Sequence, residues 1–206
     1  MALDEDGDIN GARQQLNEIR IKDTHTSLRL AFAVPFVERN YAEAERALAA
    51  FANRKEFTEF DTAAAEASIA VATKRVEERR ASWAAILAEA AEKIKEKPDY
   101  PELTGSALLN AALGNTQEAI NLATRAVELG RQDALLAPQM LKTLAVVYTW
   151  TGEKDLAFEI LFPLAKTPPN VLSAGDLKIN PDWDNLRDDP RFNELVAEAS
   201  KPIKLD

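Results

Sequence analysis

The first residues whose types and spacing could do chemistry are acidic and amide side chains near the N-terminus. Asp6, Asp8 and Asn10 stand at alternating positions and Gly11 follows, which is the D-x-D-x-N-G pattern that opens an EF-hand loop. Oxygen ligands at this spacing can surround a calcium ion, and the glycine permits the sharp turn. A calcium-binding loop from Asp6 to Asn17 is therefore one hypothesis.

Two features of the same stretch argue against a calcium loop. The twelfth loop position needs a bidentate carboxylate, but it holds Asn17, and Glu18 comes one residue late. Only five residues precede Asp6, too few for the entering helix of a helix-loop-helix unit. The alternative is a turn at Gly7 that leads into a helix with one apolar face. That face would consist of Ala12, Leu16 and Ile19.

No catalytic constellation emerges from the rest of the chain. The single histidine is His25, cysteine is absent, and there is no GxSxG, HExxH or phosphate-binding glycine loop. The carboxylate pairs Glu77-Glu78 and Asp188-Asp189 are typical of solvated surface in an acidic chain. The sequence predicts no catalytic residues, no metal ligands, no cofactor and no enzymatic activity.

Composition predicts an all-α fold. The chain has 206 residues, 46% of them hydrophobic, only 7 glycines, and long alanine-rich segments with Glu, Lys and Arg. The net charge of -9 disfavours nucleic acid as a partner. The longest apolar run, Leu30 to Val37, is too short to span a bilayer, which predicts no membrane insertion. The N-terminus lacks secretory-signal features, so we expect a cytoplasmic protein; the periplasmic part of a membrane-tethered parent is the alternative.

An internal repeat organises the chain. Gly114 and Gly152 stand 38 residues apart, and each precedes an alanine, Ala119 or Ala157, by five residues. Small or apolar residues follow each alanine at the fourth and seventh positions, which is the stripe of a helix that buries one face. These residues are Ala123, Ala126, Leu161 and Leu164. The pattern predicts a helical hairpin that turns at the glycine and packs closely at the alanine.

Weaker copies of this unit extend the repeat towards the N-terminus. Ala44 fits as an anchor with Arg39 in place of the glycine, and Ala12 fits with Gly7. The region 61–97 has no glycine turn, and the sequence leaves open whether it forms one helix or two. Prolines are expected at hairpin boundaries and Asp99 as a helix cap, whereas Pro163 is expected to kink the last repeat. The boundary prolines are Pro98, Pro101, Pro138, Pro168 and Pro169.

The repeat resembles the tetratricopeptide (TPR) family. The residues that carry the resemblance are Tyr148, Gly152, Ala157 and Pro169 in one unit and Ala107, Gly114, Ala119 and Ala126 in the unit before it. The resemblance implies a right-handed superhelical solenoid of antiparallel hairpins over residues 1–170, with an incomplete first unit and degenerate central units. It also implies a non-catalytic scaffold that binds a protein or peptide, similar to the C-terminal region of bacterial multidomain signalling or regulatory proteins. The chain would then be a fragment of a longer protein.

Residues 171–206 are expected to cap the array. Trp183, Leu186 and Phe192 are large apolar anchors, and Asp189-Pro190 has the types of an N-cap and a first-turn proline for a short last helix. A terminal unit must cover the exposed end of a helical array. We therefore interpret Trp183 as a core residue.

The resemblance also places a partner-binding groove on the first helices of the hairpins. An acidic, apolar partner segment would meet Phe36 and Trp150, with Lys142 and Arg29 attracting its carboxylates. The asparagines with which some relatives bind a terminal carboxylate are missing. Alternatively, Phe36 and Trp150 pack between hairpins, and the chain is a rigid spacer or a homodimerisation element. The predicted groove residues are Arg29, Ala33, Phe36, Thr104, Leu108, Lys142, Val146, Thr149 and Trp150.

Overall fold

The structure, a computed structural model, describes residues 7–18, 25–50, 58–167 and 171–201. All regular secondary structure in these ranges is helical, which confirms the predicted all-α class. The helices are α2 (Ile9–Glu18), α3 (His25–Val37), α4 (Tyr41–Ala49), α5 (Glu59–Thr73), the 3-10 helix η1 (Val76–Glu78), α6 (Arg80–Glu96), α7 (Tyr100–Ala112), α8 (Thr116–Gly130), α9 (Leu136–Thr151), α10 (Lys154–Leu164), α11 (Ala174–Ile179), the 3-10 helix η2 (Pro181–Leu186) and α12 (Pro190–Ala199).

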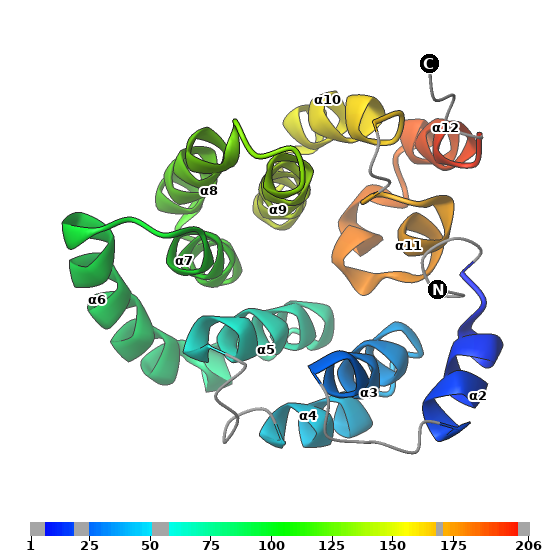
Figure 1. The fold of residues 1–206 in the computed structure, drawn as a ribbon, viewed down its shortest axis with the longest axis horizontal. Coiled ribbons are helices and arrows are strands. Elements are labelled where there is room, and N and C mark those ends of the chain that lie inside the picture. The colour runs from blue at the N-terminus through cyan, green and yellow to red at the C-terminus, as the bar shows by residue number, and fades with distance from the viewer. Residues whose placement is uncertain (1–6, 19–24, 51–57, 168–170, 202–206) are drawn as a thin grey trace.

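The helices follow a curved path that is closed by the C-terminal part of the chain (Figure 1). Neighbours in sequence pack as pairs: α3 with α4, α7 with α8, and α9 with α10. Pairs are joined through α5 against α7 and α8 against α9, while α12 packs on α10. The helices α11 and η2 lie on the inner side of the curve, where η2 contacts both α5 and α9. None of the helices in the described ranges is long and apolar enough to cross a membrane.

The turns and anchors of the repeat lie where the sequence predicts them. All four predicted turn residues have positive φ: Gly7, Arg39, Gly114 and Gly152. All four anchor alanines are buried: Ala12, Ala44, Ala119 and Ala157. At φ of 80° and 87°, Gly114 and Gly152 adopt a conformation that side chains disfavour, which explains the glycines there.

Region 61–97 contains two helices rather than one. Helix α5 ends at Thr73, and Lys74 caps it in the left-handed conformation at φ 58°. The short helix η1 follows before α6 begins at Arg80. The turn has no glycine and is lengthened by η1, which explains why the glycine spacing does not mark it. Trp83 fixes α6, since its side chain is fully buried among alanines of α5 and Leu109 of α7.

The predicted helix cap at Asp99 is present, but Pro163 does not have the predicted effect on its helix. Asp99 accepts a hydrogen bond from the backbone of Tyr100 at the start of α7, as predicted. Pro163 does not interrupt α10, because it stands in the last turn and the helix ends at the next residue, Leu164. A proline there forfeits one hydrogen bond at an end that stops anyway. The boundary prolines Pro168 and Pro169 lie outside the described residues.

The closing segment, residues 171–199, is part of the core. Trp183 and Leu186 are fully buried and Phe192 is 5% exposed, in one cluster with side chains of α9 and α10. Asp189 caps α12, whose first residue is Pro190, as predicted. The segment therefore packs on α9 and α10 and also reaches inside the curve of helices.

Candidate partner-binding groove

The predicted groove residues of α9 lie directly under the closing segment. The Lys142 ammonium is 3.0 Å from Asp176 Oδ2 of α11. Val146 is 7% exposed and belongs to the cluster that contains Trp183. Thr149 is fully buried, and its backbone carbonyl accepts a hydrogen bond of 3.3 Å from Asn185 Nδ2. This part of the groove is occupied by the chain itself.

The predicted groove residues of α7, together with Trp150, lie between the hairpins. Thr104 is half-buried and donates its hydroxyl to the Tyr100 carbonyl at 2.7 Å. Leu108 is half-buried and packs against two clusters at once, the one around α12 and the one around α8. Trp150 packs against these two clusters and against the cluster around Trp83, and its Nε1 is buried without a hydrogen-bond partner. Trp150 thus takes the packing position that was the alternative to partner binding.

The predicted groove residues of α3 also differ from one another in exposure. Phe36 is 5% exposed, stacks on Phe32 at 5.4 Å between ring centroids, and meets Tyr41 edge-on at 6.0 Å. Ala33 is half-buried and Arg29 is exposed. Within the predicted set, Arg29 is the one exposed side chain. The structure therefore does not bring these residues together as one open groove.

A polar cluster joins the closing segment to the inner side of the helices. Asp176 is its centre: Oδ2 accepts from Trp183 Nε1 at 3.0 Å and faces Lys142, while Oδ1 accepts from Asn180 Nδ2 at 3.1 Å. Asp182 lies beside it, and burial raises the pKa of its carboxyl to about 7. Among the described residues, no group of three or more His, Cys, Asp or Glu could hold a metal ion.

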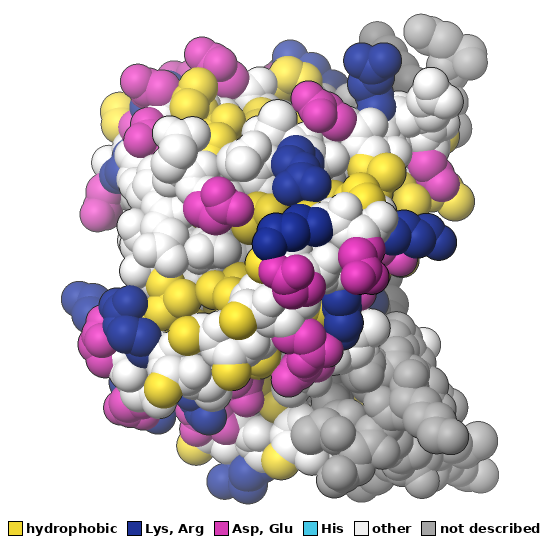
Figure 2. Space-filling view, turned by 90° about the vertical axis from the view of Figure 1, so that its left-hand side faces the viewer, with side chains coloured by type: hydrophobic (Ala, Val, Ile, Leu, Met, Phe, Trp, Pro, Cys, Tyr) yellow, Lys and Arg dark blue, Asp and Glu magenta, His cyan; other side chains and the backbone are white. Residues whose placement is uncertain are grey.

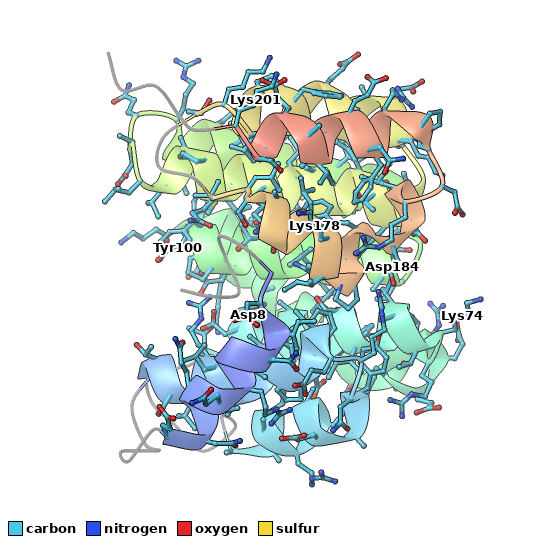
Figure 3. The ribbon with its side chains drawn as sticks, turned by 90° about the vertical axis from the view of Figure 1, so that its right-hand side faces the viewer. Asp8, Lys74, Tyr100, Lys178, Asp184 and Lys201 are labelled. Atoms are coloured by element: carbon cyan, nitrogen blue, oxygen red, sulfur yellow. The ribbon has the colours of Figure 1, made fainter. Side chains whose placement is uncertain are left out.

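The closing segment also meets the N-terminal helices, so the curve is closed into a ring. Arg39, at the turn between α3 and α4, donates to both carboxylate oxygens of Asp184 at 2.8 and 2.9 Å. Burial raises the pKa of Asp184, but its bonds to Arg39 and Arg187 outweigh burial and the net shift is downwards. Ile179 of α11 packs against the cluster that contains Ala12 of α2. Figure 3 shows this junction, with Asp8, just before α2, below Lys178 and Asp184 on the closing segment.

Helix α2 is held on the neighbouring hairpin by Arg13. Its guanidinium donates to Glu38 and, at 2.8 Å, to Glu43, and the hydrogen bonds to these carboxylates raise the pKa of Arg13. The helices α2, α3 and α4 enclose a cleft of about 330 Å³. Its lining is mixed in character: Arg13, Leu16, Asn17, Ser27, Ala31, Glu43, Arg46 and Ala47.

The stretch of the calcium hypothesis is helical for most of its length. Residues 9–18 form α2, and Asp8 Oδ1 accepts a hydrogen bond of 2.9 Å from the backbone N–H of Gly11. Asp8 therefore satisfies a free N–H at the start of a helix, which is what an aspartate commonly does there. Asp6 lies outside the described residues.

The outer side of the ring is mixed in character. Figure 2 shows acidic and basic side chains dispersed among apolar ones on the face over α6 and α8. On α6 several alanines are exposed, flanked by ion pairs such as Glu89 with Lys93 at 2.7 Å. The described part of this face therefore shows no single-sign patch that would select a charged partner.

Sequence reasoning missed that the closing segment reaches the inner face. The available signal was charge: Lys142 was predicted to point into the groove, and Asp176, Asp182 and Asp184 recur along the segment that follows. No protein-family model, curated protein or solved structure matches the chain when it is compared with each of these.

Proposed function

We propose that this chain is a non-catalytic protein-interaction module of the tetratricopeptide type, in which the inner face of an array of helical hairpins binds a polypeptide segment. One observation carries the proposal: that face binds a polypeptide segment already. Residues 174–187 of the chain lie on it, and they engage Lys142 through an ion pair, Thr149 through its backbone carbonyl and Val146 through apolar contact.

The bound segment indicates which chemistry the face selects. A carboxylate meets the Lys142 ammonium, and seven residues later an indole is buried completely. Ion pairing for register and a buried aromatic anchor for affinity are the means by which helical grooves recognise peptides. A partner segment of the same chemistry, acidic with an aromatic anchor, would suit this face.

The exposure of the predicted residues divides them into two sets. Arg29 is exposed, and Ala33 and Thr104 are half-exposed, so these can meet a partner while the closing segment stays in place. Lys142, in contrast, is already paired with Asp176, so a partner carboxylate would compete with Asp176 for its ammonium. A partner that binds the exposed residues does not need the Lys142 ammonium, whereas a partner that replaces Asp176 does. Mutation of Lys142 therefore distinguishes the two kinds of binding.

A rigid spacer or dimerisation element is the second candidate, and ring closure favours it. The Arg39–Asp184 ion pair and the packing of Ile179 on the cluster of α2 tie the two ends of the array together. A closed ring resists bending more than an open array does, because contacts at both ends must break together. Such a body could hold other domains at a fixed distance.

The test is affinity capture from a lysate of the cells that express the protein, with four immobilised forms. These are the native chain, Arg29→Glu, Lys142→Glu, and the charge swap Lys142→Glu/Asp176→Lys. The swap keeps an ion pair to the closing segment but reverses the charge on the helix. Circular dichroism and melting curves check that each variant folds.

The proposal expects a protein that the native chain retains and that Arg29→Glu or Lys142→Glu loses. If the swap restores retention, Lys142 acts by holding the closing segment. Because Asp176→Lys also removes the acceptor of Trp183 Nε1, a swap that fails to restore retention assigns no role to Lys142, and Arg29→Glu then tests the partner site. Retention of the same proteins by all four forms would contradict the groove. Sedimentation that shows concentration-dependent dimers of the native chain would then support the second candidate.

A further inference from the structure

The carboxyl group of Asp182 lies where the closing segment meets the inner side of the ring. Asp182 belongs to η2, which packs against α5 and α9. Its Oδ1 atom is buried and has no hydrogen-bond partner, while Ser68 of α5 is hydrogen-bonded to the carboxyl group. A charged oxygen that is buried loses its hydrogen bonds to water, and without a protein donor no hydrogen bond replaces them. The neutral acid therefore suits this position better than the carboxylate.

The charged groups around Asp182 do not replace the lost hydration. Lys142 of α9 faces it, but the Lys142 ammonium lies 3.0 Å from Asp176 Oδ2 and is already paired. Asp176 of α11 faces Asp182 with a like charge. Helix α5 contributes only the neutral hydroxyl of Ser68, and Asn180, at the start of η2, is also neutral.

These surroundings set the proton affinity of Asp182. Burial raises the pKa of the carboxyl to about 7; the hydrogen bond from Ser68 opposes this, the charge of Asp176 adds to it, and Lys142 and Asn180 oppose it. An aspartate in water has a pKa of about 3.9. The group therefore changes charge near neutral pH when η2 is docked, and near pH 4 when it is not.

We propose that Asp182 is a pH-sensitive latch, which holds η2 against α5 and α9 when it is protonated and weakens that docking when it is ionised. Docking is strongest below about pH 4, where Asp182 is protonated in both states. Docking then weakens as pH rises from about 4, the pKa of the undocked group, to about 7, the pKa of the docked group, and it stays weak above that value. Across this window the undocking equilibrium constant rises about tenfold for each pH unit.

Two other carboxylates of the closing segment, those of Asp184 and Asp189, have pKa values below this window. The pKa of Asp184 is lowered, so its bridge to Arg39 stays charged from pH 5 upwards. Asp189, which caps α12, has a pKa lowered to about 2 by its hydrogen bonds with Arg191. A change in docking between pH 5 and 7 is therefore assigned to Asp182 rather than to these carboxyls.

Two measurements on the whole chain test the latch. Carbon-13 NMR of the aspartate side-chain carboxyls, in the native protein and in Asp182→Asn, looks for a carboxyl with a midpoint near pH 7. Hydrogen exchange of the backbone amides of residues 181–187, corrected for the intrinsic effect of pH, follows docking from pH 5 to 8. The matched control is Asp188→Asn, since Asp188 is an exposed aspartate just beyond η2.

We expect the native protein to show the high carboxyl midpoint and to lose about tenfold in amide protection per pH unit between pH 5 and 7. Asp182→Asn should lose both effects, and Asp188→Asn should retain both. A native Asp182 that titrates near pH 4 would overturn the latch, and so would equal pH slopes in native and Asp182→Asn proteins. The NMR titration of the native protein tests the latch even if Asp182→Asn folds poorly. Neither measurement needs a partner protein, so the latch is tested independently of the proposed function.

Discussion

Lys74 offers a stability gain that follows from backbone geometry alone. It ends α5 at φ 58°, where the side chain of a non-glycine residue crowds its own backbone. The left-handed conformation costs roughly 1–2 kcal/mol for such a residue. Glycine removes this strain but adds freedom to the unfolded chain, worth about 0.4–1 kcal/mol. The net expectation for Lys74→Gly is a free energy of unfolding larger by roughly 0.5–1 kcal/mol.

The matched control is the same substitution at another helix end. Lys97 caps α6 with φ -152°, which is extended backbone without strain. Lys97→Gly therefore gains nothing in the folded state and is expected to destabilise the protein by a few tenths of a kcal/mol through the unfolded chain. Both lysines are exposed, so the comparison isolates the backbone.

Differential scanning calorimetry at neutral pH measures both variants against the native chain. For a protein of this size, about 1 kcal/mol corresponds to a shift of roughly 2–4 °C in Tm. Lys74→Gly should raise Tm by about 1–4 °C, and Lys97→Gly should leave it level or slightly lower. Equal shifts in the two variants would refute the assignment of a strained turn to Lys74.

Three further predictions concern other parts of the fold. Gly152→Ala should lower the free energy of unfolding by about 1 kcal/mol in urea titrations, because φ is 87° although a Cβ would meet nothing within 4 Å. Gly105→Ala should cost more, about 1–3 kcal/mol in the same assay, because a Cβ would lie 2.7 Å from Phe60 Cβ. The Asp189 pKa is lowered to about 2 by Arg191, so the stabilisation from this carboxylate should disappear as pH falls from about 4 to 2; thermal melts of native and Asp189→Asn proteins should converge there.

The local unit of the fold could be predicted from the sequence, because its causes are local. A glycine indicates a turn at positive φ, and an alanine five positions later indicates a site where two helices pack closely. Both signals can be read from the residue type. Arg39 follows this register without being glycine, and its guanidinium is engaged by Asp184. Lys74 escaped prediction because η1 lengthens the turn after it and shifts the register of α6.

The candidate groove was harder to predict, because its state depends on contacts between residues far apart in sequence. Arg39 and Asp184 are 145 residues apart. Whether they meet depends on the curvature summed over all the intervening hairpins, which no single spacing encodes. The residue types on the inner face were predicted; that the chain's own segment lies over Lys142, Val146 and Thr149 was not.

The occupied inner face changes what a mutation there can reveal. Lys142 joins α9 to Asp176, which in turn binds the indole of Trp183, the largest fully buried side chain of the closing segment. Loss of Lys142 leaves a partly buried carboxylate without its cation, so a single charge reversal perturbs the closing segment whether or not a partner binds there. Arg29 is free of this coupling to Asp176, because it is exposed on α3. A loss of binding in Arg29→Glu is therefore the more direct sign of a partner at the predicted groove residues, whereas a loss in Lys142→Glu that the charge swap reverses is assigned to the closing segment.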